Sequence, residues 1–374
     1  MVDGSSQQGA SAGRLERLRA ACAAAGLDAY LACNTSDIRW LTAFDGVFDD
    51  EAAHALLVTG EAAVLHTDSR YSTAARRAAA GEGVVEIDDS RRSHAKFAAE
   101  SLAAGQALGI EDGMSIARYN ALVAALGEGG GAARPQLTTD FVLGLRAVKE
   151  PCEIARLKAA QAVTDAAFSH IAGFVRTGMT EREVQIELED YMRRHGADGL
   201  AFSSIVATGG NGANPHAIPG PTRLEAGQCV VLDFGARAQG YCSDMTRMLF
   251  LGEPDERLRA GYAAIRDANE QVEAALRPGV TGRAMHELAE EVLVAHGFAD
   301  KMGHGLGHGV GIDIHEEPVL NPRNEAPLVV GNVVTVEPGV YLPGDFGMRL
   351  EDCGVVTERG YEPFTQSTHE MVIV

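Results

Sequence analysis

The 374-residue chain contains no unbroken run of about 20 apolar residues, the length that a membrane-spanning helix needs. It also lacks an excess of basic residues, because 32 Lys and Arg residues are outnumbered by 52 Asp and Glu residues, which gives a net charge of −20. Nucleic acids and anionic membranes both require basic patches on a protein partner. These absences predict a soluble protein that binds neither nucleic acid nor membrane.

Closely spaced cysteine pairs are missing as well. In a chain of this size, scattered cysteines without a C-x-x-C pair predict reduced core residues of a cytoplasmic protein rather than disulfides. The six cysteines are Cys22, Cys33, Cys152, Cys229, Cys242 and Cys353. Residues 1–12 lack the basic start and apolar stretch of a signal peptide, and we expect them to form a disordered tail.

The length of the chain predicts two domains. The first part alternates amphipathic helices with short apolar strands, including a hairpin pattern at 55–67. The glycine-rich run at 127–136 is typical of a loop or a boundary. A long helix is predicted to begin at or near Pro151, where proline fits the first turn. We therefore expect an N-terminal domain with a mixed sheet at 13–145 and a second domain at 146–374.

An internal repeat is the most informative feature of the second part. "RTGMTEREVQIELEDYMRRHG" (176–196) and "RPGVTGRAMHELAEEVLVAHG" (277–297) share residues at a constant offset of 101, as from Thr180 to Thr281. Each copy is predicted to be a helix capped by its threonine, and Glu183 completes a capping box in the first copy. The simplest interpretation is two αβ halves related by a pseudo-twofold axis.

Each copy continues into an apolar strand that carries an acid. "GQCVVLDFG" and "GNVVTVEPG" both run nine residues from glycine to glycine, with Asp233 or Glu337 at the seventh position. Two more acids, Asp244 and Glu351, each follow a glycine-containing turn downstream. Matched strands would bring these four carboxylates together in the middle of the domain.

Four carboxylates in one buried site could not all stay ionised without cations, because burial and mutual repulsion raise their pKa values. Two divalent ions would balance the four negative charges. Four carboxylates with one histidine suit Mn²⁺, Co²⁺, Fe²⁺ or Zn²⁺ better than Ca²⁺ or an iron–sulfur cluster. Two such ions about 3.5–4 Å apart can share a hydroxide and stabilise a hydrolytic transition state. The acids therefore predict hydrolysis at a dinuclear metal centre.

The segment "GHGLGHGVGIDIHEEP" (303–318) holds five glycines and three histidines and allows two interpretations. A dinucleotide-binding loop needs G-x-G-x-x-G at the start of a helix. Here the spacing is G-x-G-x-G-x-G, and "GIDIHEEP" is expected to continue as a strand. The nucleotide interpretation is therefore disfavoured, and the glycines are expected to let the backbone pass close to the metals. A kinase meaning of "DFG" is disfavoured because "HRD", "VAIK" and "APE" elements are missing.

Taken in order, "LDFG", "SDMTR", "GHGLGHGVGIDIHE", "VTVEPGVY" and "RLEDCG" resemble the pita-bread metallopeptidases, the superfamily of methionine aminopeptidase, aminopeptidase P and prolidase. This resemblance covers residues 150–370. In the first domain, "NTSDIRWLTAFDG" and "TDSRYSTAA" are similar to the creatinase-type N-terminal domain of aminopeptidase P and prolidase. The implied fold class is α/β (α+β), a creatinase-like N-terminal domain followed by a pita-bread domain with an internal pseudo-twofold repeat.

The resemblance implies a metal-binding role for five residues. Asp233 would chelate one metal, Asp244 and Glu351 would bridge both, and His308 and Glu337 would complete the second. Glu337 would also be catalytic, relaying a proton between the bridging water and the leaving amine. The cofactor is expected to be two divalent metal ions, with Mn first and Co, Zn or Fe as alternatives.

Five further residues fall on positions next to the substrate in the family. His315 matches the histidine that stabilises the tetrahedral intermediate, and His216 matches the other catalytic histidine. His304 is expected to contact substrate, with structural packing as the alternative. Tyr341 and Arg349 are also expected at the substrate, with hydrogen bonding to the metal-binding acids as the alternative.

The implied activity is hydrolysis of the peptide bond before proline, with release of the N-terminal residue, as by an Xaa-Pro aminopeptidase. Proline's tertiary amide lacks the N–H that general peptidases bind. The nearest alternative is an Xaa-Pro dipeptidase (prolidase), whose site would block long chains and bind a free carboxylate. A non-peptidase hydrolase or lyase on the same fold is a further alternative, whereas the intact ligand set argues against a pure binding module. The expected partners are a peptide with proline at the second position and, from the resemblance, a second copy in a homodimer.

Overall fold

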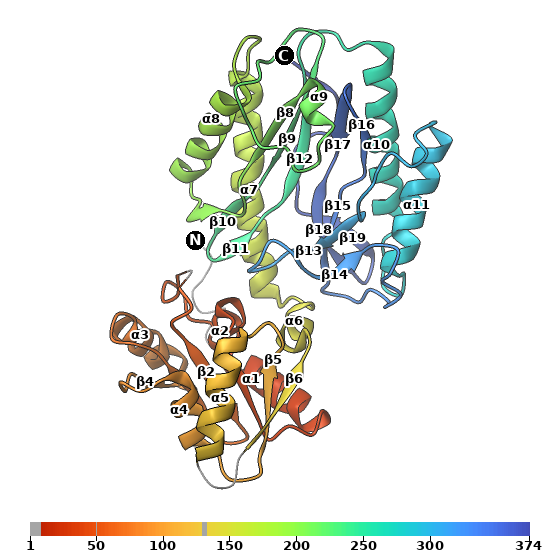
Figure 1. Ribbon diagram of the computed structural model, residues 1–374. Coiled ribbons are helices and arrows are strands. Elements are labelled where there is room, and N and C mark those ends of the chain that lie inside the picture. The colour runs from red at the N-terminus through yellow and green to blue at the C-terminus, as the bar shows by residue number, and fades with distance from the viewer. Residues whose placement is uncertain (1–8, 50, 129–132) are drawn as a thin grey trace. The chain divides into compact units, whose positions relative to one another are not determined.

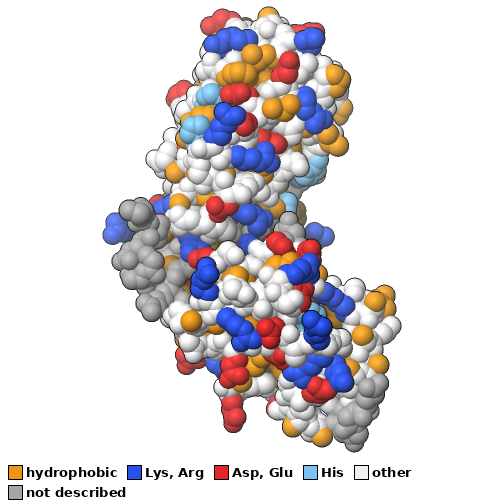
Figure 2. All heavy atoms as spheres, turned by 90° about the vertical axis from the view of Figure 1, so that its left-hand side faces the viewer, with side chains coloured by type: hydrophobic (Ala, Val, Ile, Leu, Met, Phe, Trp, Pro, Cys, Tyr) orange, Lys and Arg blue, Asp and Glu red, His pale blue; other side chains and the backbone are white. Residues whose placement is uncertain are grey.

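The computed structural model describes residues 9–49, 51–128 and 133–374. The chain forms two compact units, of which the first ends at Arg146 and the second begins at Ala147. The expected division after residue 145 lies one residue away from this point. Figure 2 shows acidic and basic side chains interspersed over one face of the molecule. Among the described residues, no helix combines the length and the apolar character that crossing a membrane requires.

The expected disordered tail, 1–12, differs from the structure at its described end. Helix α1 (Ala10–Ala24) begins at Ala10, and the buried Ser11 hydroxyl donates a hydrogen bond of 2.9 Å to the Leu41 carbonyl. Residues 10–12 are therefore helical, because this contact fixes the first turn. The expectation for residues 1–8 lies outside the described residues.

The first unit is built on one mixed sheet with strand order β4-β3-β2-β1-β5-β6 and with helices packed against it (Figure 1). The expected hairpin is formed by antiparallel β2 and β3. Of the run 127–136, expected to be a loop or boundary, residues 129–132 lie outside the described residues. Its last residues form the start of β6, where Pro135 occupies an edge strand that tolerates a residue without an N–H. The strands are β1 (Ala29–Ala32), β2 (Ala55–Thr59), β3 (Ala63–His66), β4 (Glu86–Asp88), β5 (Ala107–Glu111) and β6 (Arg134–Thr138). The remaining helices are α2 (Thr35–Thr42), α3 (Ser72–Glu82), α4 (His94–Ser101), α5 (Ile116–Glu128) and α6 (Phe141–Arg146).

The second unit contains two main sheets, with strand orders β20-β12-β9-β8 and β14-β13-β15-β18-β19. The four-stranded sheet is made by β8 (Ile205–Thr208), β9 (Cys229–Phe234), β12 (Met245–Phe250) and β20 (Val372–Ile373). The five-stranded sheet is made by β13 (Gly307–Gly309), β14 (Glu316–Leu320), β15 (Val333–Val336), β18 (Asp352–Thr357) and β19 (Gly360–Pro363). Smaller sheets are formed by β7 (Gly199–Leu200), β10 (Ala236–Ala238) and β11 (Tyr241–Cys242), and by β16 (Gly339–Leu342) and β17 (Phe346–Arg349).

Helices cover both sides of these strands. Figure 1 shows α7 and α8 on one side of the second unit and α10 and α11 on the other. Their bounds are α7 (Pro151–Phe174), α8 (Glu181–Arg194), α10 (Glu256–Ala275) and α11 (Gly282–Ala295), with the short α9 (Gly209–Gly212) after β8. Apolar side chains of α7 and α8, such as Phe168 and Leu188, pack with Leu232 and Phe234 of β9. The acid-bearing strands therefore lie in a largely buried middle layer between the helices.

The predicted repeat is present in the hydrogen bonding of the backbone. Gly178 N donates to Leu224 O over 2.8 Å, and Gly279 N, 101 residues after Gly178, donates to Leu328 O over 2.8 Å. Thr180 and Glu183 form the predicted capping box at the start of α8. We call residues 147–253 the first half of this unit and residues 254–374 the second half.

The glycine-rich segment differs in part from its expected course. A strand was expected to continue through "GIDIHEEP", but residues 311–315 form bends and β14 begins only at Glu316. Gly311 N donates to Asp313 O over 3.0 Å, which closes a tight turn. A Cβ atom on Gly311 would lie 2.4 Å from Glu316 Oε2, so the turn depends on a residue without a side chain.

Candidate active site

The five predicted metal ligands lie in or beside strands of the middle layer. Asp233 is in β9, and His308 is the central residue of β13. Asp244 directly precedes β12, Glu337 directly follows β15, and Glu351 directly precedes β18. Because the apolar neighbours of each acid are held in a core, its carboxylate is fixed at the place where the two halves of the unit meet.

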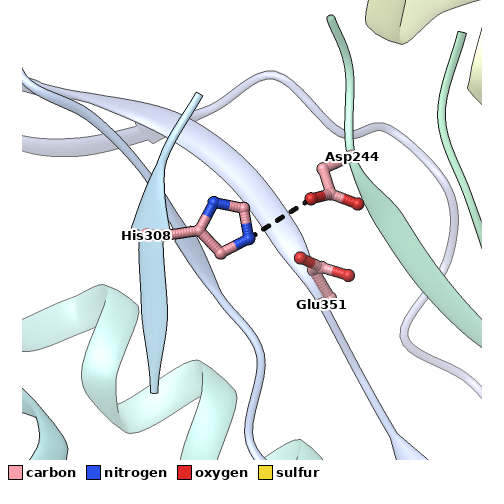
Figure 3. Close-up of side chains that lie close together, drawn as sticks. All are labelled: Asp244, His308 and Glu351. Atoms are coloured by element: carbon pink, nitrogen blue, oxygen red, sulfur yellow. Dashed lines mark ion pairs between the residues drawn. The ribbon is translucent and has the colours of Figure 1, made fainter. Parts of the chain in front are cut away.

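Three of these side chains come close enough to share one ion. One ligand atom from each of Asp244, His308 and Glu351 lies within 4.8 Å of the others. Figure 3 shows the three pointing toward one another from different strands. His308 Nε2 lies 3.5 Å from Asp244 Oδ2 and 3.5 Å from Glu337 Oε1. The structure thus brings four of the five predicted ligands into a single cluster.

The backbone around His308 presents its Nε2 atom to the carboxylates. His308 Nδ1 is 3.0 Å from the Gly309 carbonyl oxygen, which can only accept, so Nδ1 carries the proton and Nε2 keeps a lone pair. The His308 N–H donates to Thr335 Oγ1 over 3.1 Å. A Cβ atom on Gly307 would lie 2.1 Å from Thr335 O, so the close approach of β13 to β15 depends on glycine.

The fifth predicted ligand, Asp233, is held by a buried arginine. Arg349 Nη2 donates a short hydrogen bond to Asp233 Oδ2. Asp233 Oδ1 is buried and has no hydrogen-bond partner among the described residues. A buried carboxylate oxygen without a donor is costly, and a cation beside it would remove that cost. The orphaned oxygen therefore fits a metal ligand.

Electrostatics also favour cations here. Burial raises the pKa of Asp244 well above its usual range, and the charges of Asp233 and Glu337 raise it further. Burial and the Asp244 charge likewise raise the pKa of Glu351, and burial raises the pKa of Glu337. Carboxylates that resist ionisation together would be stabilised as anions by divalent ions. The donor set fits two such ions.

A chain of hydrogen bonds connects three further predicted residues. Arg349 Nη1 donates to Tyr341 Oη over 2.7 Å, and Tyr341 Oη lies 3.0 Å from His304 Nε2. His304 Nδ1 is 2.7 Å from the Gly305 carbonyl and must therefore carry its proton, so Tyr341 donates to Nε2. Burial lowers the pKa of His304, which keeps this imidazole neutral.

A cavity of about 620 Å³ opens over the cluster. Its wall includes Asp233, Asp244, His308, Glu337 and Glu351. The predicted substrate-side residues His216, His304, His315 and Arg349 also line it, whereas Tyr341 lies behind His304 and Arg349 and is not part of the wall. The His308 and His315 ring centroids are 4.4 Å apart. Both halves thus contribute side chains to one chamber.

Several residues of the site were not singled out from the sequence. Thr335 accepts from His308 N and lies 3.4 Å from Glu337 Oε1, so it holds two predicted ligands. Its position two residues before Glu337, where an extended backbone points both side chains the same way, was an available signal. The wall also includes Arg182 and Gln185 of α8 and the segment 202–205, for which the sequence offered no comparable signal.

Comparison with known proteins gives two family matches. Residues 155–358 match the metallopeptidase family M24, and residues 14–148 match the creatinase/prolidase N-terminal domain. An uncharacterized peptidase of Bacillus subtilis, YqhT, is 36% identical over 362 residues, which cover 96% of this chain and 100% of that protein. An Xaa-Pro dipeptidase of Pyrococcus furiosus is 36% identical over 233 residues, covering 62% and 67% of the two chains.

Solved structures give the same picture. The Xaa-Pro dipeptidase from Bacillus anthracis has a TM-score of 0.90 and 36% identity, covering 97% of this chain and 100% of that one. The X-Pro aminopeptidase from Thermotoga maritima has a TM-score of 0.85 and 31% identity, covering 96% and 100%. These matches confirm the predicted fold class, a creatinase-like N-terminal domain followed by a pita-bread domain.

Proposed function

The chain belongs to metallopeptidase family M24, and we propose that it is a metal-dependent Xaa-Pro dipeptidase (prolidase). It would hydrolyse the bond between the first residue and proline in a dipeptide. The observation that carries this proposal is the cluster in which Asp244, His308 and Glu351 converge beneath a cavity. The substrate class, Xaa-Pro dipeptides, is inferred from the names of the similar proteins.

We propose that two divalent ions are held by five residues, Asp233, Asp244, His308, Glu337 and Glu351. Asp244 and Glu351 would be shared between the two ions, Asp233 would serve the first, and His308 and Glu337 the second. When bound, such ions act as Lewis acids toward a carbonyl oxygen and lower the pKa of water. Manganese is the first candidate because the donor set is rich in oxygen, and cobalt, zinc and iron remain alternatives.

The chain's own residues would manage the proton and the developing charge. Glu337 lies at the cavity wall, where its carboxylate would accept a proton from water and deliver it to the prolyl nitrogen. His315 and His216, from opposite halves, line the cavity and would donate hydrogen bonds to the carbonyl oxygen as it becomes negative. Arg349 and Thr246 would position Asp233 and Glu351 through their hydrogen bonds.

The dipeptidase replaces the aminopeptidase that the sequence favoured. The similar proteins include Xaa-Pro dipeptidases of Pyrococcus furiosus and Lactobacillus, and the structure from Bacillus anthracis is of an Xaa-Pro dipeptidase. The Xaa-Pro aminopeptidase stays as the second candidate, because the structure of the X-Pro aminopeptidase from Thermotoga maritima is similar to this chain, with a TM-score of 0.85. A lyase or other non-peptidase activity has no counterpart among these names.

The test is metal add-back with paired substrates. Metal-free protein would be supplied with Mn²⁺, Co²⁺, Zn²⁺ or Fe²⁺ and assayed on an Xaa-Pro dipeptide and on a tripeptide extended beyond the proline. We expect metal-dependent cleavage of the dipeptide and little cleavage of the tripeptide. Faster cleavage of the tripeptide would establish the aminopeptidase, and no cleavage of either with any metal would refute both.

Two further expectations from the sequence remain predictions. A homodimer would be seen in sedimentation analysis at micromolar concentration. Cytoplasmic residence would be seen by fractionating the source cells.

A further inference from the structure

We propose that Arg182 is the residue that binds the C-terminal carboxylate of the dipeptide and so determines the preference for dipeptides. This inference rests on the proposed function and identifies the group that would recognise the free carboxylate. Arg182 lies in the first turn of α8 and lines the cavity, as does Gln185 one turn later. Its backbone N–H donates to Gly220 O over 3.1 Å, which fixes the helix start beside the cavity wall at 215–219.

The acids next to Arg182 are committed elsewhere. Glu181 Oε1 accepts from Thr208 N at 3.0 Å, and Glu181 Oε2 accepts from Gly220 N at 3.1 Å. Glu183 is held in the capping box with Thr180. Residues three and four positions later on the helix are Gln185 and Ile186, so no acid occupies the positions that would form a helical ion pair. Among the described residues, no salt bridge to Arg182 is formed.

The other arginine of the cavity wall is already used. All three guanidinium nitrogens of Arg349 donate hydrogen bonds, to Asp233, Thr246 and Tyr341, and the residue is buried. Arg182 is exposed and has no such bonds among the described residues. Of the arginines and lysines that the cavity wall contains within the described residues, Arg182 is thus the one whose charge is available to a ligand.

The second half supplies an internal comparison. Arg283 follows Arg182 by 101 residues, and its backbone N–H donates to Asn324 O over 2.9 Å, in the same way as Arg182 donates to Gly220. The Arg283 side chain, however, donates to Pro322 O over 2.8 Å and forms an ion pair of 2.6 Å with Glu325. The same backbone position thus carries a paired arginine in the second half and, in the first, an arginine that lines the cavity and forms no ion pair with any described residue.

The ligand chemistry follows from charge. The protein has a net charge of −20, and four carboxylates line the cavity, so the negative end of a zwitterionic dipeptide needs a positive partner within it. A guanidinium offers parallel N–H donors that match a carboxylate. A dipeptide ends in a carboxylate directly after proline, whereas a longer peptide has a neutral amide there. Arg182 would therefore favour the dipeptide.

The experiment compares Arg182→Met with the matched control Arg283→Met. Both are assayed on an Xaa-Pro dipeptide and on its C-terminal amide, and the amide is scored as a competitive inhibitor if it is not cleaved. Wild-type enzyme and the Arg283→Met variant should prefer the carboxylate. Arg182→Met should raise KM for the dipeptide about tenfold with little change in kcat, because this contact is made equally in the ground and transition states. Binding of the amide should not change.

Two additional measurements make the result decisive. Arg182→Lys should retain part of the preference, and added salt should weaken dipeptide binding in wild type more than in Arg182→Met. An Arg182→Met enzyme that folds normally, as judged by its melting temperature, and still prefers the carboxylate would overturn the inference. A wild-type enzyme that leaves Xaa-Pro dipeptides intact would instead overturn the proposed function, so the two failures are distinguishable.

Discussion

The two halves of the second unit share a backbone scheme but differ in what their side chains do. In the first half the residue after the capping threonine is Glu181, whose buried carboxylate ties β8, α9 and the 215–220 segment to the helix. In the second half that residue is Gly282, where a Cβ atom would lie 2.4 Å from Val319 O. The first half stabilises this region with the buried Glu181 carboxylate. The second half instead brings the Gly282 backbone close to the Val319 carbonyl.

The same contrast applies to the site. Each half contributes two acids from matched positions, Asp233 and Asp244 from the first and Glu337 and Glu351 from the second. The histidine at the cluster comes from the second half alone, on the glycine-rich segment that contains β13. The four carboxylates thus follow the internal repeat, whereas the histidine of the cluster belongs to one half.

The strongest way to sharpen this comparison is to remove one acid from each half. Asp244→Asn and Glu351→Gln should each lower kcat by at least about a hundredfold, because replacing a residue that only hydrogen-bonds to a metal ligand already lowers metal affinity or activity by about 10–100-fold. Metal content per chain should fall in both variants, as measured by atomic emission. Normal turnover in either variant would contradict a shared role for the matched acids.

A second test concerns the ion pair that joins the halves. Arg247 Nη2 lies 2.6 Å from Asp352 Oδ1, with side chains only 1% and 2% exposed. Arg247→Met would leave a buried carboxylate without this partner and should lower the free energy of unfolding by about 3–5 kcal/mol in urea titrations. The exposed pair of Arg257 and Asp345, at 2.6 Å, provides the control, and Arg257→Met should cost no more than about 1 kcal/mol.

A third test addresses the glycine-rich segment of the second half, whose strand β13 pairs with β15 as β8 pairs with β9 in the first half. Gly307→Ala would place a methyl group against Thr335 O, where the built Cβ lies at 2.1 Å, and should cost about 1–3 kcal/mol and weaken metal binding. Gly305→Ala is the control, because its Cβ would be 3.3 Å from its nearest neighbour, a side-chain atom of Asn321. Equal melting temperatures for the two variants would show that the close approach of β13 to β15 is not needed.

The smallest expected difference lies at the helix starts. At the start of α8 the Thr180 side chain accepts a hydrogen bond from Glu183 N, and the Glu183 side chain accepts one from Thr180 N. Thr281 caps α11 through a single hydrogen bond of 3.1 Å from Ala284 N. Thr180→Ala should therefore cost about 1–2 kcal/mol and Thr281→Ala closer to 1 kcal/mol. Thermal unfolding of the two variants measures the difference, and a larger loss for Thr281→Ala would reverse the order.

Features that depend on local pattern could be predicted from the sequence. The repeat at a 101-residue offset, the capping box of Thr180 and Glu183, and the acids on apolar strands all follow from periodicity and residue type. The apolar strands could bury their acids only where charge is compensated, so a meeting of the four carboxylates was expected, whereas the place of His308 beside them was implied only by the family resemblance.

Features that depend on contacts between distant segments could not be predicted. The bend at 311–315 brings Gly311 close to Glu316, and nothing in local propensity excludes a strand there. The hydrogen-bonded chain from Arg349 through Tyr341 to His304 requires the folded positions of three segments. Arg182 and Arg283 occupy equivalent positions in the sequence, and only the folded neighbours distinguish a paired from an unpaired guanidinium.

The ligand atoms are separated widely along the chain, with Asp244 and His308 contributed by different halves. A fragment or folding intermediate with only one half formed would therefore have little affinity for the ions. Binding that requires both halves draws the equilibrium toward the complete fold by mass action. A chelator should accordingly lower the resistance of the second unit to proteolysis, because the ions that we propose for the reaction would also hold the two halves together.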